Sequence, residues 1–190
     1  MAFARILAEL GTNAYAASQV GISAWSLSFM PGFGFAVAAT TLVGQSLGAE
    51  VPERAERQGY TAFRLGAGLM AAVGILFLLF PARIVGFFTN APEVIALGTM
   101  PLRMVGLIQP LLAANMIFGG ALRGAGDTRF PMLVTGIGVY VLRLPIAYLF
   151  AVVFGWGLVG AWGALIFDFS TRGVLNFLRF RSGRWKAVRV

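Results

Sequence analysis

The chain has 190 residues, of which 58% are hydrophobic and 12% are charged, and its mean hydropathy is +0.82. This composition excludes an ordinary soluble globular domain. The absence of cysteine and histidine excludes disulfides, thiolate metal sites and the usual histidine-based catalytic triads.

Five apolar segments are long enough to cross a membrane. A spanning helix needs about 20 apolar residues, whereas a barrel strand needs only about 9–11 residues of alternating polarity. We therefore expect an all-α fold, a polytopic membrane helical bundle. Its complete transmembrane helices are expected at residues 14–49, 65–88, 94–122, 131–155 and 158–180. Residues 1–10 look like the end of a preceding helix, so the sequence predicts the stub of a sixth helix within a single lobe, 1–190.

The first span contains Pro31, which removes an internal hydrogen bond and predicts a helix kink. Near the end of this span, Gly44 and Gly48 form a G-x-x-x-G pattern that permits close helix approach. The polar segment Glu50–Arg64 follows. It contains Glu50/Arg54 and Glu53/Arg57 at i,i+4 spacing, which predicts a short helix lying at the membrane interface.

A tight, polar connection separates the third and fourth spans. It contains the turn residues Arg123, Gly124, Gly126, Asp127 and Thr128. An apolar chain needs such a run of small and charged residues where the backbone leaves the membrane, turns and re-enters. The sequence therefore predicts a sharp turn here, with helices packed closely around its glycines.

The connection before the last span contains the pattern Gly155-x-Gly157-x-x-Gly160, which matches a dinucleotide-binding fingerprint. That fingerprint requires a preceding strand, a following helix and an acidic residue about 20 positions later, all in a water-soluble βαβ unit. Here the pattern joins two membrane spans. We interpret these glycines as a surface for helix packing.

Basic residues occur in every other connection. They follow the first, third and fifth spans, whereas residues 89–93 and 155–157 contain no lysine or arginine. The positive-inside rule then predicts a multi-pass protein of the cytoplasmic membrane with its C-terminus, the basic tail 181–190, in the cytoplasm. The net charge of +8 is explained by topology, so we expect no nucleic-acid partner.

Polar side chains inside the spans are the candidates for a substrate or cation pathway, because each is costly in hydrocarbon. These candidates are Asp168, Arg143, Gln109, Asn115, Gln19 and Gln45. Asp168 has Arg172 at i+4, which allows either an intrahelical ion pair or a role in handling substrate or cation. Arg143 is either a counter-ion for Asp168 or part of a water-filled cavity. The neutral residues either bind ligand or form hydrogen bonds between helices.

Three motifs carry a family resemblance. Pro31-Gly32-Phe33-Gly34 followed by Val43–Ala49 resembles a helix of the multidrug and toxic compound extrusion (MATE) transporters. Gly120–Thr128 is similar to that family's "G-x-LRGxGDT" turn, and Leu10–Gln19 is similar to the entry into the same helix. Together the motifs cover about two-thirds of the chain in the family's order and spacing.

The resemblance implies the C-terminal lobe of such a transporter, from the end of its seventh helix to its twelfth. It further implies secondary active efflux, in which organic, often cationic, drug-like compounds leave in exchange for Na⁺ or H⁺. No enzymatic activity, metal or cofactor is expected, and no coupling-ion site transfers onto a residue of this chain. The expected partners are the small-molecule substrate, membrane lipid, and a missing N-terminal lobe or a second copy. A non-transporting fragment or assembly partner, and a related lipid-linked-sugar flippase, are the alternatives.

Overall fold

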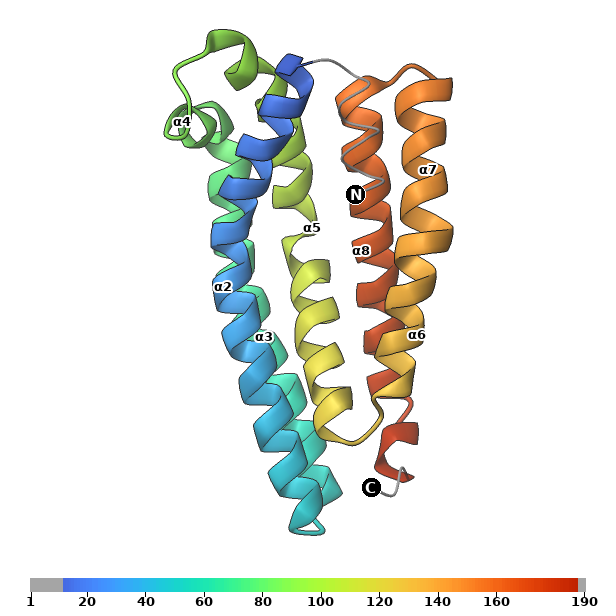
Figure 1. Cartoon of the computed structure of the whole chain (residues 1–190). Helices are drawn as coiled ribbons and strands as arrows, with labels where there is room; N and C mark the ends of the chain where they lie inside the picture. The colour runs from blue at the N-terminus through green and yellow to red at the C-terminus, as the bar shows by residue number, and fades with distance from the viewer. Residues whose placement is uncertain (1–11, 188–190) are drawn as a thin grey trace. The chain divides into compact units, whose positions relative to one another are not determined.

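A computed structural model of the chain describes residues 12–187, and these residues are helices joined by short connections (Figure 1). The described part contains no strand, and five of its helices are long and apolar enough to cross a membrane. The predicted all-α membrane fold is therefore confirmed. The predicted stub at residues 1–10 lies outside the described residues.

The helices have the following bounds. The first four are α2 (Thr12–Gly48), α3 (Pro52–Leu79), α4 (Pro81–Gly86) and α5 (Pro92–Gly124). The fourth span, Arg129–Val153, consists of α6 (Arg129–Ile137), η1 (Gly138–Arg143), α7 (Leu144–Tyr148) and η2 (Leu149–Val153). The chain continues with α8 (Gly157–Arg181) and the short 3₁₀-helix η3 (Arg184–Ala187).

The chain divides into two compact units, each built from several of these helices. Unit 1 contains the described residues up to Phe29, then Ala72–Ile108 and Val139–Asp168. Unit 2 contains Met30–Ala71, Gln109–Gly138 and the described residues from Phe169 onward. The helix ends that flank the connections of unit 2 carry arginine, at Arg54, Arg123, Arg129 and Arg181, whereas the connections at residues 87–91 and 154–156 of unit 1 contain no charged residue.

The polar segment Glu50–Arg64 differs from its prediction as a separate interfacial helix. Helix α3 runs without interruption from Pro52 to Leu79, so most of this segment is the first part of a membrane-length helix. Glu50 lies before α3 with a positive φ of 59°, which removes the helical spacing that a Glu50/Arg54 pair would need. Neither Glu53 nor Arg57 forms an ion pair with any described residue. Exposed pairs of this kind gain little, which explains their absence.

Helix α3 also ends earlier than the predicted span 65–88. Phe80 precedes Pro81 and has φ −125° and ψ 39°, outside the helical region. A residue before proline avoids the α conformation because the proline ring collides with it. Pro81 therefore ends α3 and begins the short helix α4.

The fourth span contains a π-helical turn, η1, which ends at Arg143 and is followed by Leu144 and Pro145. Proline has no N–H to donate to the carbonyl group of Val141, and its ring collides with that carbonyl group. A wider helical turn relieves the collision. Arg143 is the last residue of η1, so the proline is part of what sets the direction of this charged side chain.

Helices α2 and α5 approach each other closely in unit 2, through backbone rather than side chains. A Cβ atom added at Gly120 or Gly124 would collide with the carbonyl oxygen of Ala36 or Thr40, and one at Gly44 would lie 3.0 Å from the carbonyl oxygen of Gly124. The Thr40 hydroxyl donates a hydrogen bond to the Gly120 carbonyl oxygen at 2.9 Å. The predicted close packing at the turn glycines is therefore present, with Gly120 and Gly124 as its centre.

Gly124→Ala is expected to lower the free energy of unfolding by about 1–3 kcal/mol, because the new methyl group meets backbone that cannot move aside. Gly34→Ala is the matched control, since its Cβ would meet nothing within 4 Å in the same unit. That control should be neutral or slightly stabilising. Thermal unfolding in detergent micelles measures both, and equal effects of the two substitutions would contradict the packing argument.

An aromatic cluster forms the centre of unit 2 and includes the start of the C-terminal basic segment. Trp185 of η3 is fully buried and stacks on Phe180 with ring centroids 4.8 Å apart and an interplanar angle of 8°. Phe180 in turn contacts the rings of Phe118 and Tyr60. The Trp185 indole N–H donates a hydrogen bond to the Phe180 carbonyl oxygen at 2.6 Å. Burial of the Trp185 side chain thus holds the segment after α8 against the rest of unit 2. The charge pattern of this segment did not predict that burial.

Candidate functional site

The first candidate site is a buried ion pair within unit 1. Asp168 lies near the middle of α8, and Arg143 ends η1. The Arg143 Nη2 atom lies 2.6 Å from Asp168 Oδ2, and the Arg143 Nε–H donates to the same oxygen at 2.7 Å. The sequence left two roles open for Arg143, and the structure brings it to Asp168 as a counter-ion.

Burial makes this pair expensive to separate. The Asp168 side chain is 0% exposed and that of Arg143 is 18% exposed. Both belong to helices that are apolar enough to cross a membrane. A charged side chain at the centre of a bilayer is strongly disfavoured unless it is paired, so each residue stabilises the charge of the other.

Arg172, the other arginine near Asp168 in sequence, belongs to unit 2 and is also buried. Its guanidinium lies 4.6 Å from the centroid of the Phe169 ring, a cation–π arrangement. This aromatic contact of Arg172 has no counterpart in the sequence prediction, which considered only the spacing to Asp168.

No group of three or more carboxylates gathers within the described residues. A monovalent cation that binds Asp168 would have to compete with the guanidinium of Arg143 for the same oxygen. In the structure, the Arg143 guanidinium occupies that position on Asp168 Oδ2.

The neutral candidates separate into buried and exposed residues. Gln109 is fully buried in α5, whereas Gln19 and Gln45 on α2 are exposed. Gln19 accordingly makes a local contact, in which its Nε2 donates to the Tyr15 hydroxyl oxygen at 2.9 Å. A role for these glutamines in a substrate or cation pathway stays a prediction.

Asn115 belongs to a small polar pocket within unit 2. The Asn176 amide nitrogen donates to Asn115 Oδ1 at 3.1 Å and to the Asn115 carbonyl oxygen at 3.3 Å. The buried Asn176 Oδ1 has no hydrogen-bond partner among the described residues. Arg123 and Thr135 also line this cavity of about 180 Å³. Asn115 and Arg123, predicted for different reasons, thus lie around one pocket.

The turn after α5 is held by an ion pair. Gly126 has a positive φ of 83°, which a side chain would disfavour and which lets the chain reverse here. Asp127 Oδ2 then accepts a hydrogen bond from Arg179 Nε of α8 at 2.7 Å, and the Asp127 side chain is almost completely buried. The Arg179 guanidinium also lies over the Phe130 ring. The predicted turn residues therefore fasten the turn to α8, with Arg179 as the partner that the sequence did not identify.

The chain is similar in sequence to known proteins of one family. The sequence profile of the MatE family matches residues 1–149. A probable multidrug resistance protein NorM of Thermotoga maritima is 41% identical over 187 residues, which cover 97% of this chain and 40% of that protein. A protein of the same name from Brucella suis is 36% identical over 93% of this chain and 38% of its own length.

A solved structure shares the fold. The outward-facing structure of a multidrug resistance MATE family transporter superposes with a TM-score of 0.85 at 20% identity, over 92% of this chain and 39% of that chain. The present chain spans about 40% of the length of the relatives that it matches. It belongs to the MatE family, the multidrug and toxic compound extrusion transporters.

Proposed function

We propose that this chain forms one lobe of a secondary active efflux transporter, which exports organic, often cationic, compounds in exchange for Na⁺ or H⁺. Family membership supports the efflux role, since the matched relatives are described as multidrug resistance proteins. The match to about 40% of their length supports the need for a second lobe, supplied by further chain or by a second copy. The work of such a protein is transport across the membrane and not an enzymatic reaction.

The observation that carries the proposal is the buried Arg143–Asp168 pair. Transport coupling requires that an ion bind two conformations with different affinity. A proton or Na⁺ on Asp168 would weaken its attraction for the Arg143 guanidinium. A buried arginine charge is costly in hydrocarbon, so cation binding would favour a conformation in which Arg143 is better hydrated.

The distribution of basic residues supports the orientation. Arginine and lysine concentrate at the helix ends that flank the connections of unit 2 and in the segment after α8. We propose that these connections lie on the cytoplasmic side of the cell membrane, together with the C-terminus.

Asp168→Asn is expected to reduce ion-driven export by about tenfold or more, because an amide can neither take up a proton nor attract a cation. The measurement is uptake of a fluorescent cationic dye into membrane vesicles under an imposed Na⁺ or H⁺ gradient. The chain is expressed alone, and together with the part of the Thermotoga maritima relative that it does not cover.

Asp127→Asn is the matched control, since it makes the same change in a second paired and buried carboxylate. It should leave the dependence on the gradient intact. Gradient-dependent export that survives Asp168→Asn would refute the coupling role of Asp168. Absence of export in every combination that inserts into the membrane would refute the efflux proposal itself.

A further inference from the structure

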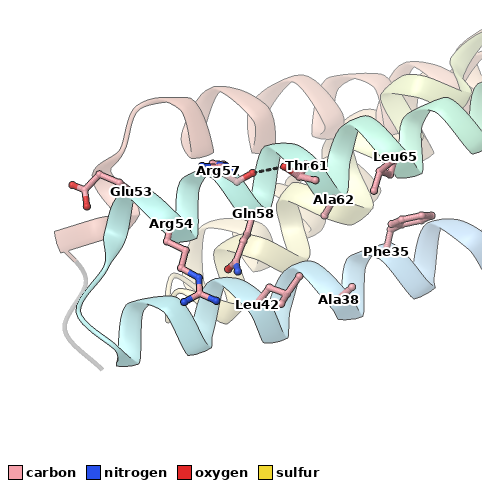
Figure 2. Close-up of a pocket in the computed structure, with 10 residues that line it drawn as sticks. All are labelled: Phe35, Ala38, Leu42, Glu53, Arg54, Arg57, Gln58, Thr61, Ala62 and Leu65. Carbon is pink, nitrogen blue, oxygen red and sulfur yellow. Dashed lines mark hydrogen bonds between the residues drawn. The ribbon is translucent and has the colours of Figure 1, made fainter.

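A groove of about 710 Å³ lies between α2 and α3 within unit 2. Figure 2 shows Arg54 and Gln58 of α3 extending toward the α2 segment that carries Leu42. Its lining residues are Phe35, Ala38, Leu42, Glu53, Arg54, Arg57, Gln58, Thr61, Ala62 and Leu65. The volume lies within the range of about 300–1,000 Å³ that is typical of small-molecule sites. None of the candidate residues from the sequence lines this groove.

The two ends of the groove differ in polarity. On α3, the charged and amide side chains precede the apolar ones, so that Arg54 marks the polar end and Leu65 the apolar end. The α2 wall is apolar at Phe35, Ala38 and Leu42. A ligand that fits both ends must be amphiphilic.

The polar end carries positive charge that the protein does not neutralise. No described residue forms an ion pair with Arg54 or Arg57. In Figure 2 the Arg54 guanidinium extends toward α2, whereas the Glu53 carboxylate points outward, away from the groove. The Gln58 side-chain oxygen Oε1 accepts a hydrogen bond from the Ser46 hydroxyl at 2.6 Å, which fixes the amide between the two helices. The polar end of the groove has two arginines and one glutamate, and the glutamate points outward. This end therefore favours an anionic group.

The length of the groove matches one leaflet of a bilayer. A helix rises about 1.5 Å per residue, so Arg54 and Leu65 are separated by about 16 Å along α3. Half of the hydrocarbon core of a bilayer measures about 15 Å. Arg54 also lies close to the start of a membrane-length helix, where arginine meets lipid headgroups. An acyl chain that begins at the arginines would reach the bilayer midplane near Leu65.

We propose that this groove binds one anionic phospholipid of the surrounding membrane. The phosphate of the lipid lies at Arg54, and the charge of Arg57 adds to the electrostatic attraction. One acyl chain lies along Leu42, Ala38 and Leu65. Free phosphate would leave the apolar wall unused, and a cationic drug would be repelled by the arginines. The groove shares no residue with the Arg143–Asp168 pair, and the proposal does not rest on the proposed efflux.

The test measures lipid retention by the purified full chain in a neutral detergent. Native mass spectrometry compares phosphatidylglycerol with phosphatidylcholine of identical acyl chains, and inorganic phosphate serves as a competitor. Arg54→Gln should weaken phosphatidylglycerol binding about fivefold, and the further change Arg57→Gln about fivefold again. Arg64→Gln is the control, since it removes the same charge from an exposed arginine of α3 that does not line the groove.

A second variant tests the apolar wall without changing charge. Ala38→Phe places a ring in the groove and should reduce retention of phosphatidylglycerol while the arginines remain. Three outcomes would overturn the proposal: equal retention of the two lipids, an equal loss in Arg64→Gln and Arg54→Gln, or full competition by inorganic phosphate. Because the readout is binding, these results do not depend on whether the chain takes part in transport.

Discussion

Asp168→Ala is expected to lower the free energy of unfolding by about 3–5 kcal/mol, because it removes one member of a buried ion pair. The carboxylate is fully buried and holds the Arg143 guanidinium at 2.6 Å. Without it, the arginine keeps its charge in an apolar part of the helix bundle and must find water or another acceptor. Denaturation in mixed detergent micelles measures the loss.

A double-mutant cycle separates the ion pair from the rest of the packing. Arg143→Met alone and Asp168→Leu alone each leave one charge without this partner, and each should be strongly destabilising. Asp168→Leu combined with Arg143→Met removes both charges and should lie within about 1–2 kcal/mol of the unmodified chain, or above it. If the two single losses simply add in the double variant, the residues do not stabilise each other and the proposed coupling element is absent.

The sequence predicted the helical class well because the bilayer imposes strict rules on composition and length. Only helices and closed barrels satisfy backbone groups in lipid, so five long apolar segments left little choice. The helix ends were harder to predict. Hydropathy placed the second span at residues 65–88, whereas local backbone chemistry at Pro52 and Pro81 decided where α3 and the following α4 begin.

The candidate site was predicted in its members, and its pairing was one of the alternatives left open. The sequence offered both Arg172 and Arg143 as partners of Asp168, and only the fold could show that Arg143 reaches the carboxylate from another helix. Pro145 was a usable signal, since a proline in a span forces a local change of helical register near Arg143. The direction of the Arg143 side chain, however, depends on three-dimensional packing.

The groove at Arg54 and the buried Trp185 were missed for a common reason. Both lie in segments whose role was predicted from their charged residues alone. These segments are the polar stretch after the first span and the basic C-terminal segment. Charge patterns report which side of a membrane a segment faces. They do not report that a tryptophan among basic residues is buried, or that two arginines lie at the end of an apolar groove.

Trp185→Ala is expected to lower the free energy of unfolding by about 3–5 kcal/mol, the usual cost of removing a large buried aromatic side chain. The indole is 0% exposed, stacks on Phe180 and donates to the Phe180 carbonyl oxygen. Its removal leaves a cavity beside the aromatic cluster of unit 2. Thermal unfolding in detergent micelles, together with limited proteolysis of the segment after α8, measures the effect.

Graded substitutions identify which part of the Trp185 anchor matters. Trp185→Phe keeps an aromatic ring but loses the 2.6 Å hydrogen bond. Loss of this bond should lower the free energy of unfolding by about 1 kcal/mol, and the smaller ring should add a smaller packing loss. Lys186→Gln removes the Lys186–Glu56 ion pair, which is partly exposed and should contribute less than about 1 kcal/mol. Trp156→Ala, at a tryptophan that is 58% exposed, controls for the loss of an indole in itself. If Lys186→Gln destabilises the chain as much as Trp185→Ala, the segment is held by charge and not by burial of the indole.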